Sequence, residues 1–451
     1  MPAPLNQFAS EYYHDVDLRV VQAVPPDALA ILDIDCRAGR LGEVLKHMRP
    51  ERHITGLKLS GSTDEQVATR VDRVLSNKLE ADSLPLEAQS FDCIVADDAL
   101  AHHASPGIVL ERLRPLLRRG GRLIASLPNA QHWSVIDGLL RGNLQRSGMP
   151  WGPRARASVA AFAIADIVKL FLDAGFLPRI ADRRIIPAPP EWMISAQATL
   201  ARQRLDLSSF TSRLETCQYI IEASPIELAS APQIPTRPIT VGACVNDPDV
   251  LRENLFASPC LDSGRHETLT VENAPSAGDG LNALIERANH ELVVLAHQDV
   301  YLPSWWINRL WQQYDIARRV TGDRVGIMGV YGLSATPEGI RHCGRVVDRD
   351  FLLDEAAPLP TPVDSLDELL LIVPKRSMLR FDRTLGFHLY GTDACLTAKA
   401  SGMMAMCIDA PCHHDSKQGD ALPPAFAHSK DVLRTKWPRA LPIATPCGII
   451  A

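Results

Sequence analysis

The sequence predicts an α/β protein of two domains, each built on a largely parallel sheet with helices on its faces. Apolar runs of strand length alternate with helical patterns in both halves of the chain, and glycine-containing turns separate them; this alternation is typical of parallel sheets. Residues 223–238 are rich in Pro, Ala and Ser and show neither the periodicity of a helix nor that of a strand. We therefore expect a first domain at 1–225, a linker at 226–237 and a second domain at 238–451.

The first half contains seven segments with the character of buried strands. They are apolar and bounded by turn residues, and they lie at 28–34, 53–59, 70–75, 91–97, 121–128, 177–186 and 217–223. A helix is expected at 163–176, where apolar residues recur at spacings of three and four before Gly175. These elements predict a doubly wound sheet, whose ligands bind beyond the carboxyl ends of the strands.

The second half repeats the pattern and predicts a second nucleotide-type α/β domain with its own core. Its expected strands lie at 238–247, 269–273, 291–300 and 325–332.

Composition excludes several classes of function. The net charge of −6 argues against nucleic acid as the main partner. The sequence contains no run of about 18 apolar residues, so it predicts no membrane span. The first residues lack a signal-peptide pattern. The ten cysteines are scattered without a CxxC pair, most of them inside apolar runs. They are expected to be buried free thiols, which predicts a cytoplasmic protein.

The first expected strand runs into a turn typical of nucleotide-cofactor sites, in the stretch ILDIDCRAGRLG at 31–42. With the block at 91–129, FDCIVADDALAHHASPGIVLERLRPLLRRGGRLIASLPN, this turn resembles the class I S-adenosylmethionine-dependent methyltransferases. The resemblance covers residues 10–225 and implies a Rossmann-like sheet of seven strands in that family's order.

The family writes this turn acidic-x-Gly-x-Gly-x-Gly, because glycine admits positive φ and close approach of the ligand. Here Asp33 and Gly39 match the two ends of the pattern, whereas Asp35 and Arg37 replace the two middle glycines. Arg37 is large enough to fill the space of the cofactor's amino-acid tail.

Two further cofactor positions differ. The family ends its second strand with an acid that accepts both ribose hydroxyls, and Lys58 stands there; an ammonium group has no acceptor lone pair. Asn77 stands where the family places an Asp that faces the adenine, and its amide retains bonding capacity. These changes predict a degenerate domain that has lost S-adenosylmethionine. The alternative is an active methyltransferase with altered cofactor geometry.

In the second half, the stretch AHQDVYLPSWW resembles one branch of the family-two glycosyltransferases of GT-A fold, over residues 238–417. The resemblance implies that Asp299 is a carboxylate ligand of a divalent metal, Mn²⁺ or Mg²⁺, and that His297 contacts the ribose or a phosphate. A nucleoside diphosphate leaves with negative charge that such an ion neutralises. Trp305 and Trp306 are expected to pack in the core; the alternative is that they stack on a sugar ring of the acceptor.

The same resemblance implies further donor and acceptor residues. Those expected at the donor nucleotide are Asn246, Asp247, Glu272, Asp279 and Asn282. His413 is expected to complete the metal site, with His414 as the alternative, and the pair Asp367–Glu368 is expected near the donor. Asp393, in the stretch LYGTDACL, matches the family's general base for inverting transfer; the alternative is a helix cap.

The sequence therefore predicts a glycosyltransferase of polysaccharide biosynthesis. It would move a sugar from a nucleotide-sugar donor to a hydroxyl of a glycan, protein or small molecule, beside a methyltransferase-like domain that has lost its cofactor. The first alternative is a bifunctional enzyme that also methylates the same glycan with S-adenosylmethionine. The second is a non-enzymatic binding scaffold.

Overall fold

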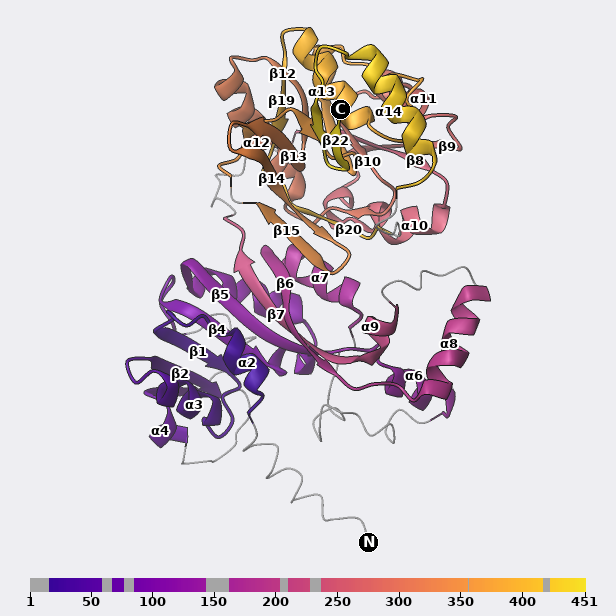
Figure 1. Ribbon diagram of the computed structural model, residues 1–451. Coiled ribbons are helices and arrows are strands. Elements are labelled where there is room, and N and C mark those ends of the chain that lie inside the picture. The colour runs from indigo at the N-terminus through magenta and orange to yellow at the C-terminus, as the bar shows by residue number, and fades with distance from the viewer. Residues whose placement is uncertain are drawn as a thin grey trace. The chain divides into compact units, whose positions relative to one another are not determined.

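The computed structural model describes residues 16–58, 67–76, 85–142, 162–202, 210–227, 237–355, 357–416 and 422–451. Contacts between Cα atoms divide the chain into two compact units, Met1–Glu227 and Leu228–Ala451. We call them the amino-terminal unit and the carboxyl-terminal unit, and each is described by itself (Figure 1).

In the amino-terminal unit, the described strands form one seven-stranded sheet of order β3-β2-β1-β4-β5-β7-β6. Strand β7 runs antiparallel to both of its neighbours, and the pairings among β3, β2, β1, β4 and β5 are parallel. The strands are β1 Ala30–Ile34, β2 His53–Lys58, β3 Arg73–Ser76, β4 Phe91–Asp97, β5 Leu117–Pro128, β6 Phe176–Ile185 and β7 Thr216–Pro225. All seven expected strands are present, although β5 begins four residues before the expected 121.

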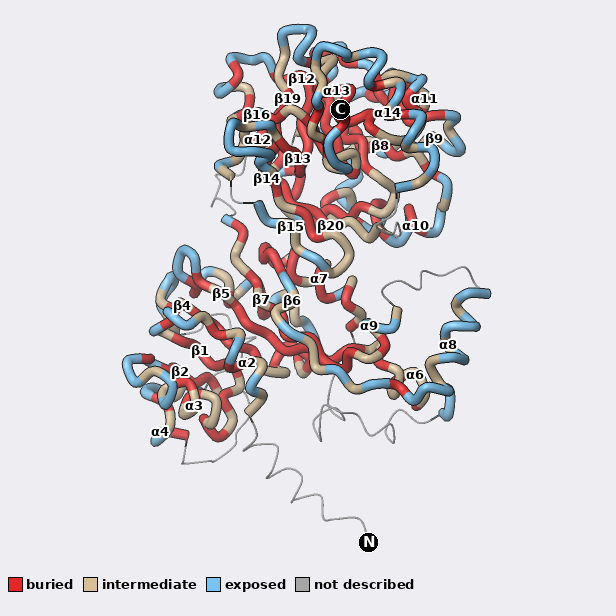
Figure 2. The backbone as a smooth tube through the Cα atoms, viewed as in Figure 1, coloured by how far each residue is buried: buried red, intermediate tan, exposed pale blue. Residues whose placement is uncertain are grey.

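Helices flank this sheet. They are α2 Leu18–Ala23, α3 Arg40–Met48, α4 Val67–Arg70, α5 Pro106–Leu113, α6 Trp133–Leu140, α7 Ile164–Asp173, α8 Pro190–Arg202 and α9 Phe210–Glu215. The spacing that predicted α7 places Ile167, Phe171 and Leu172 in the core, and the chain turns at Gly175 with φ of 78°. Figure 2 shows the central strands as the buried layer of the unit.

In the carboxyl-terminal unit, the main sheet has the order β16-β19-β12-β18-β10-β8-β9, with β18 antiparallel to β10 and β12. Its strands are β8 Thr240–Val245, β9 Glu267–Glu272, β10 Leu292–Ala296, β12 Val325–Gly329, β16 Thr361–Pro362, β18 Leu370–Pro374 and β19 Met404–Cys407. The flanking helices are α10 Pro248–Glu253, α11 Ala277–Arg287, α12 Trp306–Thr321, α13 Tyr390–Ala400 and α14 Ala425–Lys436.

A second sheet has the order β11-β20-β14-β13-β17, and β15 pairs with β14. It consists of β11 Val300–Tyr301, β13 Tyr331–Thr336, β14 Gly339–Asp348, β15 Phe351–Glu355, β17 Ser365–Leu366 and β20 Cys412–His414, while β21 Ile443–Thr445 and β22 Gly448–Ile450 form a hairpin.

Two expected strands of this unit are each divided between the two sheets. The segment expected at 291–300 forms β10 in the main sheet and then β11 in the second sheet, with a turn at His297–Asp299 between them. The segment at 325–332 divides in the same way into β12 and the start of β13. The sequence of such a segment does not indicate where the strand leaves one sheet and pairs with a strand of the other.

No helix in the described parts of the chain combines the length and apolar character needed to cross a bilayer. All ten cysteines are free, and most are buried, as the sequence predicts.

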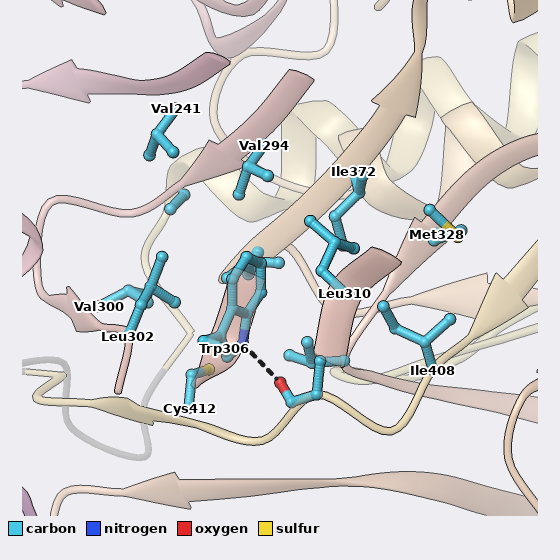
Figure 3. Packing of buried hydrophobic residues seen from close by; sticks show 14 of the residues in the cluster. Val241, Val294, Val300, Leu302, Trp306, Leu310, Met328, Ile372, Ile408 and Cys412 are labelled. Atoms are coloured by element: carbon cyan, nitrogen blue, oxygen red, sulfur yellow. Dashed lines mark hydrogen bonds between the residues drawn. The ribbon is translucent and has the colours of Figure 1, made fainter. Parts of the chain in front are cut away.

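Trp306 lies at the centre of the carboxyl-terminal core. Its ring is fully buried among Val294, Leu310 and Ile372, and its Nε1 donates a hydrogen bond of 2.9 Å to the carbonyl of Ala410 (Figure 3). Trp305 packs against the same cluster while partly buried. Core packing is therefore the observed role of Trp306.

Replacing Trp306 tests this role. Trp306→Ala should lower the free energy of unfolding of the carboxyl-terminal unit by about 3–5 kcal/mol, because it leaves a cavity. Trp306→Phe should cost less, about 1–3 kcal/mol, mainly by leaving the Ala410 carbonyl without its donor. Denaturant unfolding followed by circular dichroism would measure both. Equal stability of the alanine variant and the parent would contradict a core role.

Candidate functional site

A cavity of about 590 Å³ opens in the carboxyl-terminal unit at the carboxyl ends of β8 and β10. It is lined by the end of β8, the residues after β8 and β9, the start of α11, the turn after β10, the segment before β18 and the residues around the start of α13. These lining residues include Cys244, Asn246, Asn273, Ala277, His297, Gln298, Asp299, Glu368, Phe387, His388 and Tyr390. Beyond the carboxyl ends of parallel strands is where ligands of α/β sheets bind.

Three side chains that could hold a metal ion meet at this edge. One ligand atom from each of His297, Asp299 and His414 lies within 4.8 Å of the others. His297 and Asp299 lie in the turn between β10 and β11, and β20 pairs with β11 so that Val300 lies opposite His414. The pairing of two short strands therefore brings together residues more than 110 positions apart.

The histidine that lies with His297 and Asp299 is His414, the alternative, and not the predicted His413. Successive side chains of a strand point to opposite faces. His413 is fully buried, and its Nε2 lies 3.1 Å from the carbonyl of Arg349. His414 Nε2 lies 3.3 Å from Asp299 Oδ1.

The donor set fits a divalent cation. Asp299 Oδ1 is a buried oxygen that lies 3.3 Å from the His414 ring, and one carboxylate with two imidazoles is an ordinary ligand combination for such an ion. Asp348, which the sequence analysis did not single out, accepts a contact of 2.9 Å from His414 Nδ1. A carboxylate in this position orients a ligating histidine. It comes from β14, and only the pairing of β14 with β20 reveals it.

The charges of this cluster are strongly coupled. Burial by itself lowers the pKa of His414, but its hydrogen bonds and ion pairs with Asp299 and Asp348 outweigh burial and raise that pKa to about 10. Burial opposes ionisation of Asp299 as well, yet contact with His414 holds its pKa below the usual value. For His297, burial and then the neighbouring His414 lower the pKa.

Of the residues predicted at the donor, Asn246 and His297 line the cavity. Gln298, absent from the prediction, fixes Asn246. Its Nε2 donates to Asn246 Oδ1 at 2.6 Å, and its Oε1 accepts from the amides of Asn246 and Asp247, each at 3.1 Å. Asp247 itself caps α10 by accepting from the amides of Asp249 and Val250.

The other predicted donor residues have different surroundings and are not among the residues that line the cavity. Asn282 is buried and exchanges two hydrogen bonds with the backbone of Phe381. Asp279 pairs with Arg383 and accepts from Ser276. Glu272 is exposed at the end of β9, and the cavity is lined instead by the next residue, Asn273.

Asp393, the predicted general base, lies in the first turn of α13 with its side chain 1% exposed. Trp437 Nε1 donates to Oδ1 at 2.7 Å, and Lys436 Nζ donates to Oδ2 at 2.9 Å. The carboxylate is thus saturated by donors at the end of α14, and it does not line the cavity. This geometry argues against the predicted role and favours a structural one.

In the amino-terminal unit, the turn after β1 has the backbone of a glycine-rich loop, although two of its three glycine positions hold other residues. Asp35, Arg37 and Gly39 have φ of 58°, 49° and 75°. Positive φ is costly for residues other than glycine. Asp35 and Arg37 therefore have a backbone conformation that glycine would adopt without strain.

Arg37 lies across this turn as an internal cation. Its guanidinium is 3.7 Å from Asp97 Oδ2 and 3.9 Å from Asp98 Oδ2, it donates to the Asp97 carbonyl at 3.1 Å, and its side chain is 11% exposed. The cavity beside it, lined by Asp33, Asp35 and Arg37 among others, holds only about 20 Å³. Lys58 ends β2, half-buried, and Asn77 lies outside the described residues.

Comparison with known proteins gives a family match in this part of the chain. The family described as "MetW: Methionine biosynthesis protein MetW" matches residues 15–173. An uncharacterized 37.1 kDa protein in transposon TN4556 of Streptomyces fradiae is 33% identical over 217 residues, which are 47% of this chain; the chain spans 59% of that protein's length. A ubiquinone biosynthesis O-methyltransferase of Cereibacter sphaeroides is 25% identical over 208 residues, 44% of this chain and 80% of that protein.

Two solved structures are also similar. One is a methyltransferase described as a possible histamine N-methyltransferase from Thermotoga maritima, with TM-score 0.32, 18% identity, and coverage of 48% of this chain and 89% of that one. The other is the plantazolicin methyltransferase BpumL, with TM-score 0.33, 14% identity, and coverage of 49% and 90%.

The amino-terminal unit has the fold of a class I methyltransferase. The resemblance seen in the sequence is confirmed for this half of the chain, strand order included.

Within this methyltransferase-like unit, Asp33 is a buried carboxylic acid at the end of β1. Its side chain is 3% exposed, and its Oδ2 makes no hydrogen bond. Burial raises its pKa to about 8, against the opposing effect of Arg37. The folded state therefore holds a proton on Asp33 between about pH 4 and pH 8, while the unfolded chain releases it. This group makes the folded state less stable as pH rises through that window.

Asp33→Asn should remove this pH-dependent cost. We expect little change at pH 4 and a gain of about 1–3 kcal/mol near pH 7.5 in the free energy of opening of the unit. Hydrogen exchange of the β1 amides in the full chain, at both pH values, measures the gain. A stabilisation of the same size at the two pH values would contradict the raised pKa.

Proposed function

We propose that the carboxyl-terminal unit is a metal-dependent glycosyltransferase that moves a sugar from a nucleotide-sugar donor to a hydroxyl group. The observation that supports this most is the cluster of His297, Asp299 and His414, of which His297 and Asp299 line the cavity. The likeness of AHQDVYLPSWW to the metal motif of family-two glycosyltransferases, together with a cavity at the strand ends, favours this reaction over other metal-assisted chemistry.

Each side chain of the cluster has a definite part in this proposal. Asp299 and His414 would hold a divalent ion, with Asp348 fixing the ring of His414 through Nδ1. His297 would contact the diphosphate or ribose, and its Nε2 lies 3.0 Å from the Tyr390 hydroxyl, which limits how the ring turns. The bound ion would supply positive charge to the departing diphosphate.

The cavity also has a suitable place for the nucleoside. Asn246, locked by Gln298, lies at the end of β8 and offers an amide next to the turn after β10. Asn273 and Ala274 line the same cavity at the end of β9. A volume of about 590 Å³ is within the usual range for small-ligand sites.

Two substitutions test the metal cluster, one at a ligand and one at the residue that orients a ligand. Asp299→Ala should abolish Mn²⁺-dependent binding of a nucleoside diphosphate, because it removes the carboxylate ligand. Asp348→Asn should weaken Mn²⁺ binding by about 10–100-fold, because it loosens the ring of His414 while leaving every ligand in place. Isothermal titration calorimetry of the full chain with Mn²⁺, alone and with UDP, GDP or dTDP, measures both effects.

The control is Asp350→Asn, which changes a neighbouring carboxylate outside the cluster and should leave binding within about twofold of the parent. Nucleotide binding by Asp299→Ala with the parent's affinity and metal dependence would refute the proposal. Failure of the parent to bind any of the three nucleotides would instead favour a scaffold.

Methyl transfer by the amino-terminal unit is the second candidate function, and the match to the MetW family favours it. A bifunctional enzyme would then glycosylate and methylate one glycan. The turn with Asp35 and Arg37 argues against it, because Arg37 takes the place of a ligand among Asp97 and Asp98.

We expect S-adenosylmethionine to bind the full chain with a dissociation constant well above about 10 µM, which corresponds to a binding free energy less favourable than roughly −7 kcal/mol. The triple variant Asp35→Gly, Arg37→Gly and Lys58→Glu should gain affinity, since it reopens the turn and restores a ribose acceptor. Calorimetry measures both. Binding by the parent at or below about 10 µM would establish the second candidate.

A further inference from the structure

Glu368 lies beside the metal cluster because of how β18 pairs with β10. The two strands are antiparallel, Ala296 pairs with Leu370, and the His297 amide donates to the Leu369 carbonyl at 2.9 Å. This register carries Glu368 just past the end of β10. Its side chain therefore lines the same cavity as His297 and Asp299.

The carboxylate of Glu368 is held in place from the side of α13. Its Oε1 accepts a hydrogen bond of 3.1 Å from the Gly391 amide, and its carbonyl accepts one of 3.3 Å from the Tyr390 hydroxyl. A Cβ at position 391 would lie 2.6 Å from the Leu366 carbonyl oxygen and 3.0 Å from Glu368 Cγ. Glycine at 391 thus permits the close approach that fixes this carboxylate.

Asp393 lies in the first turn of α13, whereas Glu368 precedes β18 and contacts that turn through Gly391; the two carboxylates face different surroundings. Asp393 is turned towards Lys436 and Trp437 and is buried there. Glu368 is half-buried and lines the cavity. Of these two, Glu368 is the carboxylate that a bound acceptor could reach.

The surroundings of Glu368 suit a proton acceptor. Burial, together with the adjacent Asp367 carboxylate, raises its pKa to about 8 despite the hydrogen bonds from the start of α13. The hydroxyl of Tyr390 and the thiol of Cys447 interact with it electrostatically, and His297, Asp299 and His388 line the same cavity. A carboxylate with increased proton affinity is a stronger base than an exposed one.

We propose that Glu368, rather than Asp393, accepts the proton of the attacking hydroxyl in the reaction proposed above; this inference rests on that reaction. The hydroxyl oxygen forms a bond to the anomeric carbon of the donor sugar, and its proton passes to the Glu368 carboxylate. The bond from the anomeric carbon to the diphosphate oxygen breaks, and its electron pair leaves with the nucleoside diphosphate. One displacement of this kind inverts the anomeric configuration, and Glu368 then returns its proton to solvent.

The test uses water in place of the unidentified acceptor. The full chain with Mn²⁺ is incubated with UDP-glucose, UDP-galactose, GDP-mannose and dTDP-rhamnose, and release of the nucleoside diphosphate is followed. Glu368→Gln should lower the release rate at least about 100-fold. Its affinity for the nucleoside diphosphate with Mn²⁺ should stay within about threefold of the parent, because the amide oxygen still accepts from Gly391.

Two further variants separate catalysis from structure. Asp393→Asn should keep the release rate within about threefold, since its amide oxygen still accepts from Trp437. Glu368→Ala should be slow and should partly recover when sodium formate supplies an external base, which a purely structural role does not predict. The sugar first released by the parent should carry the opposite anomeric configuration to the donor.

Three results would overturn the assignment. They are a Glu368→Gln rate within about threefold of the parent, a loss confined to Asp393→Asn, or the absence of formate rescue in a folded Glu368→Ala. Each leaves the glycosyltransferase proposal intact if nucleotide binding still depends on Mn²⁺ and Asp299. Failure of the parent both to bind the nucleotides and to release any would overturn the two proposals together.

Discussion

The carboxyl-terminal unit depends on one backbone event, the transfer of the chain from the main sheet to the second sheet at His297–Asp299. Strand β10 ends in one ladder and β11 begins in another, so the intervening turn cannot bury its side chains in either core. Its side chains therefore emerge at the carboxyl edge of the sheet. The second sheet supplies His414 through β20 and Asp348 through β14, and both converge on Asp299.

The same edge explains the placement of the other polar groups of the cavity. Gln298 ties the turn to the loop after β8, and the pairing of β18 with β10 places Glu368 beside His297. The first turn of α13 packs so closely on the segment 366–368 that a side chain at position 391 would collide with it, which requires glycine there. The cavity, the candidate metal ligands and a fixed carboxylate thus result from the meeting of two sheets and one helix.

The amino-terminal unit shows the reverse relation between fold and site. The unit has the sheet, the strand order and the left-handed turn after β1 of its fold. Two residues of that turn have positive φ, which would cost less energy if they were glycine. Ion pairs from Arg37 give Asp97 and Asp98 a cationic partner within the unit. A large apolar core can keep this fold without a ligand, because burial of the strands does not depend on the loop beyond them.

The sequence by itself determined the two α/β halves, the seven strands of the first sheet and the positions of Asp35, Arg37, His297 and Asp299. Apolar runs and turn residues are local patterns, and a strand end followed by polar residues marks a site edge without knowledge of any partner. Tertiary structure alone decided between His413 and His414, brought in Asp348 and Gln298, turned Asp393 towards α14 and exposed Glu368 to the cavity. Each of these outcomes depends on strand register or on contacts between residues tens of positions apart, and a shift of register by one residue reverses the direction in which every side chain of a strand points.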